Sequence, residues 1–520
     1  MTDRLRRGAL PRETAAPVDP GRVGIVHLGI GAFHRAHQAV YTERAMAAAD
    51  DPTWGILGVT QRSAAVRDQL RPQGGVYGVL TAGAVAPSGT GRDAGAPGLA
   101  VGEDLRLDLV GAVVDVAYPA EETGRVLATL AAPTTHVVTL TITEKGYAQL
   151  PGGGLDVERV RPDLDVLAAE GAVLSSRVED PPVVPASSAI GLLVRGLAAR
   201  HRAGGAPITV LTCDNMVENG RVLERLVRQA VDVALPGAEG DDLRAYLDSR
   251  VTFPCSMVDR IVPATTPGQR DAVERALGLR DEGLVVGEPF SQWVIEDRFA
   301  GPRPAWELAG ATFTSDVAPY EQAKLRLLNG THSLVAYAGA LAGHATIAEA
   351  VSDPRIAARA RTYLFEDALP TLAPPDGTDL RAYGEEILRR FANPHTGHTT
   401  IQVAMDGTQK IPFRWGGVLA DSLAAGRVPA GLAFGLASWA RFVVRRTLAA
   451  AGQGADVPGG SCDGVDDPRA AELAEVVGGS DMATGPGGAD EAVRRLIALP
   501  GLLPATSDAL LAAVQEAVPV

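Results

Sequence analysis

Short apolar segments alternate with longer segments of helical periodicity over roughly the first 300 residues of this chain. A run of about four to eight apolar, often β-branched residues is typical of a buried strand in a parallel sheet. The expected strands are residues 23–28, 54–60, 76–81, 113–118, 136–143, 208–213 and 251–253. The expected helices between them are about 38–48, 119–130, 187–203 and 217–235. This alternation predicts an α/β fold built on a doubly wound sheet.

The pattern changes near residues 312–318, where the strand signals fade. Beyond this point the apolar positions recur with helical spacing. The expected helices are 319–341, 346–367, 378–391, 417–426, 430–451 and 467–477, with two more after 489. We therefore expect an α/β domain over residues 1–315 and a mostly α-helical domain over 316–520. Stretches at 91–98 and 452–488, rich in Gly, Asp, Ser and Pro, are expected to be loops or surface insertions.

The composition narrows the class of protein. The chain has 520 residues, 46% hydrophobic and 21% charged, which suits a globular protein with two cores. A net charge of −14 argues against nucleic acid and anionic membrane surfaces as partners. Apolar runs fall short of the roughly 18 residues of a membrane span, and the charged N-terminus is no signal peptide, so we expect a cytoplasmic location. Three cysteines without a CxxC pair suit a reducing compartment and give no thiolate zinc site.

A glycine turn follows the first expected strand, as Gly29-x-Gly31-x-x-His34. Strand, glycine turn and helix form the context that a dinucleotide-binding fingerprint requires. Gly29 would permit the tight turn, and Gly31 would let backbone N–H groups approach a pyrophosphate. His34 replaces the third glycine of the fingerprint, so this turn must differ from the usual one. From these residues alone, a plain βα turn and a dinucleotide site are equally good interpretations.

Four polar residues, Glu321, Lys324, Asn329 and His332, lie within one expected helix. At about 100° per residue, Asn329 lies roughly 140° around the helix from Lys324, and His332 roughly 80°. Glu321 lies roughly 60° away, so all four share one broad face. An amine, an amide and an imidazole provide the base, the oxyanion donor and the second proton-handling group of carbonyl/alcohol redox chemistry. Taken alone, a solvated charged face explains such a pattern more often, and Gly330 makes a fully regular helix doubtful.

Polar residues also close two of the expected buried strands. Asp214 and Asn215 follow one strand, and Thr143 and Glu144 end another. The carboxyl ends of parallel strands are where α/β sheets bind ligands. An asparagine there is most often a turn residue, and the alternative is an amide donor to a developing oxyanion. The role of Glu144 is open between catalytic, structural and merely solvated.

Six segments, in the same order, resemble the polyol-specific long-chain dehydrogenases, a family that includes mannitol 2-dehydrogenase and fructuronate reductase. They are IVHLGIGAFHRAHQAVY (25–41), TLTITEKGY (139–147), LTCDNMVENG (211–220), FPCSMVDRIVPATT (253–266), EPFSQWVIEDRF (288–299) and DVAPYEQAKLRLLNGTHSL (316–334), with MDGTQKIP (405–412) a looser match. The resemblance runs from about residue 23 to at least 450. It implies an N-terminal Rossmann-type domain, a C-terminal α-helical domain, an active site between them, and no metal.

The resemblance also assigns roles to residues of this chain. Lys324 resembles the general base, and Asn215 and Asn329 resemble the two amides that hold the substrate oxygen. His332 matches a group that binds and orients the substrate, and Glu321 an acid on a proton route to solvent. The implied substrate contacts are Asp259, Lys410, Arg260 and Gln402, and the implied cofactor contacts are Gly29, Gly31, Phe33, His34, Arg62, Thr143 and Glu144. Without the resemblance, Asp259-Arg260 would be a surface ion pair and Lys410 an exposed lysine in a turn-rich segment.

The implied chemistry is coherent. Lys324 must be unprotonated to accept the proton of an alcohol, and the ordinary lysine pKa of about 10.4 is far too high. Burial at a dry domain interface would disfavour the ammonium form and lower that pKa. The hydroxyl proton then goes to Lys324, and the hydride goes to the nicotinamide C4. Two amides aimed at the oxygen would stabilise the alkoxide-like transition state.

Two departures from the family bear on cofactor and substrate. The acidic residue that binds the adenosine ribose of NAD is missing from GVTQRSAAVR at 58–67, where Arg62 is placed to approach a 2′-phosphate. We expect NAD, the cofactor that the family mainly uses, with NADP as the alternative. Gln402 stands where the mannitol enzymes have arginine, and a glutamine there looks more like the hexuronate-reducing branch.

The leading hypothesis is an NAD(P)-dependent polyol dehydrogenase that interconverts a sugar alcohol and its 2-ketose, of the mannitol/fructose type. The first alternative is a fructuronate reductase that forms D-mannonate, in which Lys410, Arg260 or Arg35 would meet the substrate carboxylate. A catalytically silent sugar- or nucleotide-binding protein on the same fold ranks third. The expected partners are a small polyol, ketose or aldonate, and the expected state is a monomer or small homo-oligomer.

Overall fold

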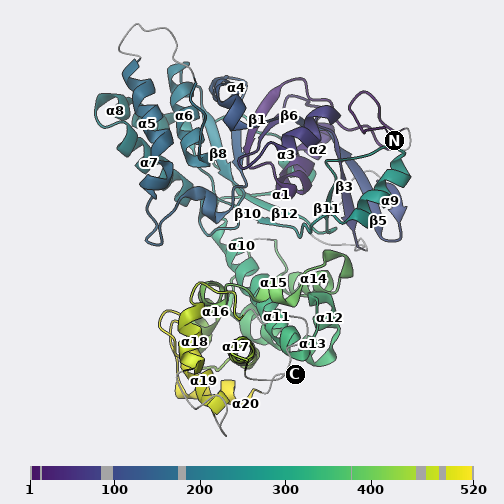
Figure 1. The fold of residues 1–520 in the computed structure, drawn as a ribbon, viewed down its shortest axis with the longest axis vertical. Helices are drawn as coiled ribbons and strands as arrows, with labels where there is room; N and C mark the ends of the chain where they lie inside the picture. The colour runs from purple at the N-terminus through teal and green to yellow at the C-terminus, as the bar shows by residue number, and fades with distance from the viewer. Residues whose placement is uncertain are drawn as a thin grey trace. The chain divides into compact units, whose positions relative to one another are not determined.

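A computed structural model describes residues 3–11, 14–83, 98–173, 183–375, 377–452, 464–478 and 488–517. The chain divides into two compact units, Met1–Ala318 and Pro319–Val520 (Figure 1). The expected loop at 91–98 lies outside the described residues except for its last residue, and so do residues 453–463 and 479–487 of the expected loop at 452–488. Residues 470–478 of that stretch form a helix, as the helical pattern at 467–477 predicts, and not a loop. None of the helices in the described part of the chain has the length and apolar content that crossing a membrane requires.

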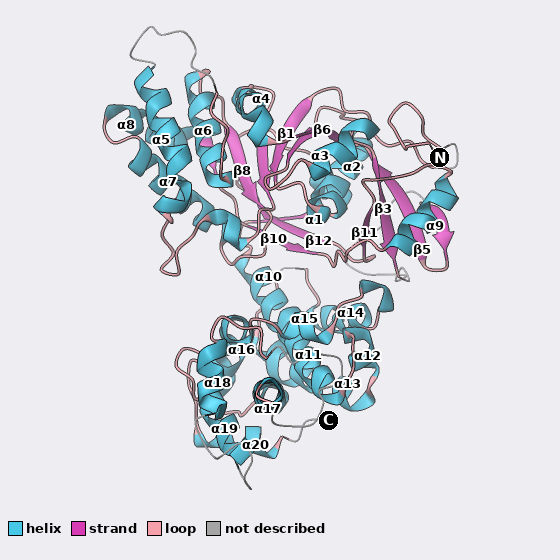
Figure 2. Ribbon diagram, viewed as in Figure 1, coloured by secondary structure: helices cyan, strands magenta, loops and turns pink. Residues whose placement is uncertain are grey.

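The first unit is built on a six-stranded parallel sheet in the order β6-β2-β1-β7-β8-β9 (Figure 2). Its strands are β1 (Val23–Leu28), β2 (Gly55–Val59), β6 (Val113–Ala117), β7 (Val137–Leu140), β8 (Ile208–Thr212) and β9 (Val251–Thr252). The chain runs outward from β1 to β2 and β6, then returns to β7 on the other side of β1. The reversal between β1 and β7 is the switch point at which a doubly wound sheet binds its ligand. The expected fold class is confirmed.

Helices cover both faces of this sheet. They are α1 (Ala32–Ala36), α2 (Gln38–Ala49), α3 (Ala65–Leu70), α4 (Pro119–Ala131), α5 (Val157–Val173), α6 (Ala189–Arg202), α7 (Asn219–Ala234) and α8 (Ala238–Arg250). A further helix, α9 (Pro267–Leu277), packs instead against a smaller, four-stranded sheet. Val26 and Leu28 of β1 lie in the apolar core that contains residues of α4 to α7, whereas Ile25 lies in the core that contains α2. Because side chains alternate along a strand, His27 shares the face of Ile25, beneath α2.

Two smaller sheets complete the first unit. One has four strands, β3 (Tyr77–Ala82), β4 (Leu99–Gly102), β5 (Leu105–Val110) and β11 (Val285–Gly287), and the other has three, β10 (Ser256–Asp259), β12 (Gln292–Glu296) and β13 (Thr312–Thr314). The strand expected at 76–81 therefore exists, but it does not belong to the doubly wound sheet. It pairs antiparallel with β5 and parallel with β11. An apolar run predicts a strand without saying which strand it will pair with.

The second unit is helical. Its elements are α10 (Ala318–Ala323), the π-helix η4 (Lys324–Asn329), α11 (Gly330–Ala342), α12 (Ile347–Ser352), α13 (Pro354–Thr362), the π-helix η5 (Tyr363–Ala368), α14 (Leu380–Phe391), α15 (Thr400–Ala404), α16 (Gly407–Ala424), α17 (Ala430–Ala450), α18 (Ala470–Gly478), α19 (Gly488–Ile497) and α20 (Asp508–Glu516). The helices α11 and α17 pack against each other in one apolar core. The helices expected at 319–341 and 346–367 are each interrupted by a π-helical segment.

The segment 405–412 differs from the expectation of a turn-rich loop, because α16 begins at Gly407. Asp406 takes the left-handed conformation that starts the helix, with φ +55°. The backbone N–H of Thr408 then donates to a carboxylate oxygen of Asp467, 2.8 Å away. Pro412 is accommodated inside the helix. Glycine, threonine and proline together are typical of a turn, and the tertiary contact with Asp467 overrides that local preference.

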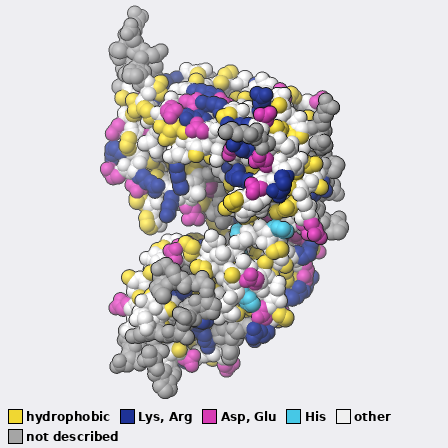
Figure 3. Space-filling model, turned by 45° about the vertical axis from the view of Figure 1, so that its right-hand side comes forward, with side chains coloured by type: hydrophobic (Ala, Val, Ile, Leu, Met, Phe, Trp, Pro, Cys, Tyr) yellow, Lys and Arg dark blue, Asp and Glu magenta, His cyan; other side chains and the backbone are white. Residues whose placement is uncertain are grey.

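Charged side chains of both signs are interspersed on the surface. On the face drawn in Figure 3, basic and acidic side chains lie among one another, and the described residues of this face show no extended basic patch.

Candidate functional site

The turn after β1 contains two glycines with different constraints. Gly29 has φ +95°, and a Cβ added to it would lie 2.1 Å from the carbonyl oxygen of Thr141. Gly31 is exposed, and an added Cβ there would meet only the carbonyl oxygen of Gly29, at 3.8 Å. Gly29 is therefore required by the turn itself, whereas the open space at Gly31 is available to a ligand. This arrangement fits the cradle that a dinucleotide pyrophosphate needs.

His34, which replaces the third glycine of the fingerprint, lies fully buried beneath the turn. Its ring stacks on that of His27 in β1, with 3.4 Å between the ring centroids and 17° between the planes. The hydroxyls of Thr139 and Thr141 lie 2.7 and 2.8 Å from the His27 nitrogens. Burial lowers the pKa of His27 to about 3 and the pKa of His34 well below its usual value, so both rings are neutral and stack without repulsion. The His34 side chain thus supports the turn from inside the unit.

Two buried arginines fasten the segment that follows the turn. Arg35 donates to the carbonyl oxygens of Gly31, at 3.3 Å, and Gly283, at 2.6 Å. Arg260, which directly follows β10, donates to the carbonyl oxygen of Ala36. It also donates twice to the carbonyl oxygen of Glu288, at 2.9 and 3.1 Å. These backbone acceptors give both guanidinium groups a structural role. The substrate contact that the resemblance implies for Arg260 stays a prediction beside this structural role.

Three other predicted cofactor contacts, Phe33, Thr143 and Glu144, lie at the carboxyl ends of β1 and β7. Phe33 is half-buried and stacks on His37, with 5.1 Å between the ring centroids. Thr143 and Glu144 are exposed. Thr143 has φ +65° and ψ 158°, a conformation that residues other than glycine rarely adopt. Such conformations persist only where the surroundings impose them, and they concentrate at ligand sites.

Asp214 imposes this conformation. Its carboxylate accepts hydrogen bonds from the backbone N–H groups of Ile142 and Thr143, at 2.9 and 3.0 Å, and from the hydroxyl of Tyr147, at 2.8 Å. Burial raises the pKa of Asp214, and these three donors oppose that rise. Asp214 therefore ties the end of β8 to the end of β7, and its neighbour Asn215 lies exposed at the same edge of the sheet.

Asn219 is a buried residue that the sequence analysis missed. Its Nδ2 donates to the carbonyl oxygens of Asp214, at 3.0 Å, and Ser256, at 2.7 Å, and its Oδ1 accepts from the N–H of Ser256, at 3.0 Å. Asn219 thus joins the end of β8 to β10, whose last residue is the buried Asp259. The only signal in the sequence was an asparagine at the start of an expected helix, where it is ordinarily explained as a cap.

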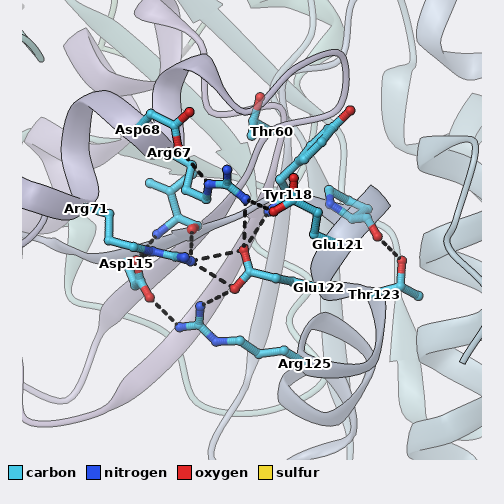
Figure 4. Close-up of polar contacts among 12 residues, drawn as sticks. Thr60, Arg67, Asp68, Arg71, Asp115, Tyr118, Glu121, Glu122, Thr123 and Arg125 are labelled. Atoms are coloured by element: carbon cyan, nitrogen blue, oxygen red, sulfur yellow. Dashed lines mark hydrogen bonds and ion pairs between the residues drawn. The ribbon is translucent and has the colours of Figure 1, made fainter.

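The residues after β2 decide how the ribose of an adenosine would be recognised. Arg62 is exposed and makes no ion pair with any residue that the structure describes. The neighbouring arginines form an ion-pair network, which Figure 4 shows: Arg67, Arg71 and Arg125 pair with Asp68, Asp115, Glu121 and Glu122. The charges of these arginines are compensated within the network. The charge of Arg62 therefore stays available to an added anion, such as a 2′-phosphate.

In the second unit, the helix that carries Lys324 is not a continuous α-helix. Residues Lys324–Asn329 are π-helical, and the N–H of Gly330 donates to the carbonyl of Leu325, five residues back. The rotation angles between side chains that the sequence analysis assigns at about 100° per residue are therefore wrong for this segment. Residues five apart in a π turn face the same side, much as residues four apart do in an α-helix. Lys324 and Asn329 thus lie closer on one face than expected.

The members of the predicted site that are buried in this unit are Glu321, Lys324 and Asn329. His332 follows one turn later, with its ring centroid 4.7 Å from that of Phe391 and 5.7 Å from that of His398. Burial, followed by the electrostatic effect of His398, holds the pKa of His332 well below its usual value. His332 is therefore a neutral imidazole, which can donate one hydrogen bond and accept another.

The two remaining predicted contacts differ in burial. Lys410 lies in α16, where its Nζ donates to a backbone carbonyl at 2.6 Å and lies 3.7 Å from a carboxylate oxygen of Asp406. Burial lowers the pKa of Lys410, and the charge of Arg414 lowers it further. Gln402 is exposed at the start of α15 and forms a capping box with Thr399. The capping box is a structural explanation of Gln402 that stands beside its predicted substrate contact.

Each unit thus holds its own part of the predicted site. The first unit supplies a turn suited to a dinucleotide, Asn215 after β8 of the six-stranded sheet, and Asp259 at the end of β10 in the three-stranded sheet. The second unit supplies an amine, an amide and an imidazole on one largely buried segment. Within the described ranges, no three His, Cys, Asp or Glu side chains are arranged to hold a metal ion.

Comparisons with known proteins match both units. Residues 23–308 match the family model described as the mannitol dehydrogenase Rossmann domain, and residues 316–460 match the mannitol dehydrogenase C-terminal domain. D-mannonate oxidoreductase of Escherichia coli is 38% identical over 459 residues, which are 87% of this chain and 84% of that protein. Mannitol 2-dehydrogenase of Cereibacter sphaeroides is 36% identical over 444 residues, 85% of this chain and 84% of that protein. The structure of Pseudomonas fluorescens mannitol 2-dehydrogenase in a ternary complex with NAD and D-mannitol is 29% identical, with a TM-score of 0.74 over 99% of this chain and 96% of that chain.

Proposed function

Because this chain belongs to the mannitol dehydrogenase family, we propose that it is a nicotinamide-dependent dehydrogenase that interconverts a sugar alcohol and its 2-ketose, of the mannitol/fructose type. The observation that carries the proposal is the buried π-helical segment, which presents Lys324 and Asn329 on one face with the neutral His332 beyond it. NAD is the proposed cofactor, since the related solved structure is a complex with NAD. Arg62 makes NADP the alternative.

The residues have distinct roles in this reaction. A bound nicotinamide dinucleotide supplies the hydride acceptor. Lys324 accepts the proton of the substrate hydroxyl as general base, and His332 orients that hydroxyl. Asn215 and Asn329 donate to the substrate oxygen as negative charge develops on it, an interaction worth about 2.7–4 kcal/mol per donor in other enzymes.

The distribution of lysine supports the role of Lys324. Of the 48 basic residues of the chain, only three are lysines: Lys145, Lys324 and Lys410. Lysine differs from arginine in that its amine can lose its proton when it is desolvated. A chain that otherwise uses arginine keeps a lysine at a buried position where a titratable amine is needed. Lys324 is such a position.

A second candidate substrate is an aldonate, D-mannonate, which would be oxidised to its keto acid. The relative named D-mannonate oxidoreductase is as similar to this chain as the mannitol enzyme is. The positive charges of Arg414, Arg390 and Lys410 act on His332, and they would favour an anionic substrate. Lys410 would then meet the substrate carboxylate.

The test is a panel of D-mannitol and D-mannonate, each with NAD and with NADP, followed by the absorbance of the reduced nicotinamide. The proposal predicts turnover of mannitol, and turnover of mannonate alone would select the second candidate. Lys324→Ala should lower kcat by about 10²- to 10⁴-fold and leave coenzyme affinity unchanged. Lys324→Arg should be equally inactive, because a guanidinium keeps its proton.

The outcomes separate the proposal from a silent binding protein. If neither substrate is turned over, both enzymatic candidates fail, and a sugar- or nucleotide-binding protein becomes the better explanation. If Lys324→Ala retains its kcat within about threefold, Lys324 is not the general base.

A further inference from the structure

The π-helical segment Lys324–Asn329 changes how this helix bonds its own carbonyl groups. The carbonyl of Leu325 accepts from Gly330, five residues ahead, whereas α11 continues from Gly330 as an α-helix with bonds to the fourth residue ahead. At the change from one pattern to the other, one carbonyl oxygen loses its partner within the helix. A buried carbonyl needs a hydrogen bond, so a donor has to come from elsewhere in the unit.

The donor is the hydroxyl of Tyr363. Its oxygen lies 2.7 Å from the carbonyl oxygen of Arg326. Tyr363 is fully buried, and burial raises its pKa above the usual value, so the hydroxyl keeps its proton and acts as a donor. The approach is possible because residue 330 is glycine: an added Cβ there would lie 2.0 Å from the same hydroxyl oxygen. Gly330 and Tyr363 therefore form one complementary contact.

Two side chains of α16 bond the carbonyl groups that follow. Trp415 donates from Nε1 to the carbonyl oxygen of Gly330, at 3.0 Å. Arg414 donates from Nη1 to the hydroxyl of Ser333, at 2.7 Å, and more distantly to the carbonyl oxygen of Asn329, at 3.4 Å. Three carbonyl groups between residues 326 and 330 thus accept from side chains outside their own helix. This is the support that a departure from α-helical bonding requires.

Tyr363 is itself held by the core of the unit. It begins the second π-helical segment, Tyr363–Ala368, against which α17 starts. Gly431 of α17 lies so close to it that an added Cβ would be 2.5 Å from the backbone nitrogen of Tyr363. Asp367 of the same segment accepts from the N–H of Leu432, at 2.8 Å. The position of the Tyr363 hydroxyl is therefore set by buried backbone contacts.

We propose that Tyr363 is a positioning residue: its hydroxyl keeps the segment Lys324–Asn329 π-helical, and the π form presents Lys324 and Asn329 on one face. The proposal rests on the proposed function, in which those two residues act on the substrate. Tyr363 acts through the carbonyl group of Arg326 and touches neither substrate nor cofactor. If the segment became α-helical, each carbonyl would bond one residue earlier in the chain. Asn329 would then rotate about the helix axis relative to Lys324 by about 100°.

The experiment compares Tyr363→Phe with Tyr337→Phe. Both tyrosines are fully buried in this unit, but the Tyr337 hydroxyl has no hydrogen-bond partner among the described residues. Tyr363→Phe should lower kcat by about 10- to 100-fold, as misplacement of catalytic groups does, and shift the pH profile of alcohol oxidation. Its coenzyme affinity should change by less than about twofold, because the dinucleotide turn lies in the other unit. Tyr337→Phe should match the wild type in all three measurements.

A second pair of variants reaches the same contact from the other side. Gly330→Ala pushes the Tyr363 hydroxyl away and should reproduce the fall in kcat. Gly416→Ala in α16 is its control, because an added Cβ there makes an ordinary 3.6 Å contact with Pro504. The proposal is overturned if Tyr363→Phe keeps the wild-type kcat and pH profile. It is equally overturned if both Tyr363→Phe and Gly330→Ala fail to fold or lose coenzyme affinity with kcat, since a general structural role then suffices.

Lys324→Ala, measured in parallel, separates the two proposals. An active Lys324→Ala protein would contradict the proposed function. An inactive Lys324→Ala protein beside a fully active Tyr363→Phe protein would contradict only the role of Tyr363.

Discussion

The two units place their predicted site residues by different physical means. In the Rossmann unit, Asn215 and the residues of the dinucleotide turn stand at the carboxyl ends of parallel strands, where the sheet topology puts them. The backbone of Thr143 there has a positive φ, which the hydrogen bonds from the N–H groups of Ile142 and Thr143 to the Asp214 carboxylate stabilise. In the helical unit, Lys324 and Asn329 stand inside a helix whose bonding pattern changes at that point. One unit therefore uses the ends of regular elements, and the other uses an irregularity within one.

The difference indicates how substitutions in each unit should affect stability and activity. A strand end is supported by the whole sheet, so a single side chain beyond it can change while the fold persists. A π-helical segment persists only while donors outside the helix satisfy its carbonyl groups. We therefore expect substitutions in the Rossmann unit to separate stability from activity more cleanly than those in the helical unit.

The largest expected effect tests whether the two units serve one reaction. Asn215→Ala and Asn329→Ala should each lower kcat by about 10²- to 10³-fold, because each removes a donor to the developing oxyanion. Groups that act as a unit are not additive, so the double variant should lose far less than the product of the single losses. Steady-state kinetics of the three proteins measures this directly. Asn215 is exposed, so only Asn329→Ala should also lower the melting temperature.

A control for this comparison is Asn393→Ala, which removes an amide of the helical unit that caps a short helical turn. It should leave kcat unchanged. If the kcat losses of the two single variants multiply fully in the double variant, the two amides act on separate steps. That result would contradict a shared oxyanion site.

The sequence predicted the parts of this molecule that follow from local patterns. Strands β1, β7 and β8 and the residues at their ends were expected, because apolar runs and the topology of α/β sheets specify them. The predicted site residues Lys324, Asn329 and His332 come from a shared helical face and a family resemblance, and their roles stay predictions. The sheet to which β3 belongs was not predicted, since pairing depends on residues distant in the chain.

What the sequence could not show were contacts made across the fold. The π turn at Lys324 depends on Tyr363 and Trp415, which no periodicity connects with it. Arg260 donates to backbone carbonyl groups of two distant segments, which its motif does not indicate. Asn219 joins two strand ends that are distant in the sequence. Each of these needs a partner that only the tertiary structure identifies.

The next expected effect uses glycines to compare the two units. Gly29→Ala places a Cβ 2.1 Å from a backbone carbonyl at φ +95°, and neither the carbonyl nor the dihedral can adjust cheaply. It should destabilise the Rossmann unit by more than about 1 kcal/mol and abolish coenzyme binding. Gly330→Ala creates one close contact, with the Tyr363 side chain, but Gly330 has the helical φ of −64° and adds no dihedral strain, so this variant should cost less stability. Circular dichroism melting curves and fluorescence titration with NADH measure the two quantities.

Gly31→Ala is the matched variant within the same turn. An added Cβ there has open space, so the melting temperature should stay near that of the wild type. Coenzyme affinity should nevertheless fall by about tenfold, because the methyl group would occupy the space that a pyrophosphate needs. A Gly31→Ala protein that binds NADH like the wild type would show that the dinucleotide does not lie against this turn.

The last expected effect concerns one buried carboxyl group in each unit. Burial raises the pKa of Glu43 in the Rossmann unit to about 7 and the pKa of Asp367 in the helical unit to about 6, above the ordinary values of 4.5 and 3.8. Between the ordinary and the raised pKa, the folded protein holds a proton that the unfolded chain has lost. Stability therefore falls as pH rises through this window, by about 3 kcal/mol at most for each group.

Neutral amides at these positions remove the titration. Relative to the wild type, Glu43→Gln should gain unfolding free energy as pH rises from about 4.5 to 7, and Asp367→Asn from about 3.8 to 6. Each amide also loses part of the accepting capacity of a carboxylate, which adds a constant cost, so the change with pH is the quantity to measure. Denaturant titrations at several pH values provide it, with the exposed Glu158→Gln as control. If the two differences were independent of pH, neither group would be protonated in the folded state, and burial alone would not describe the interior of either unit.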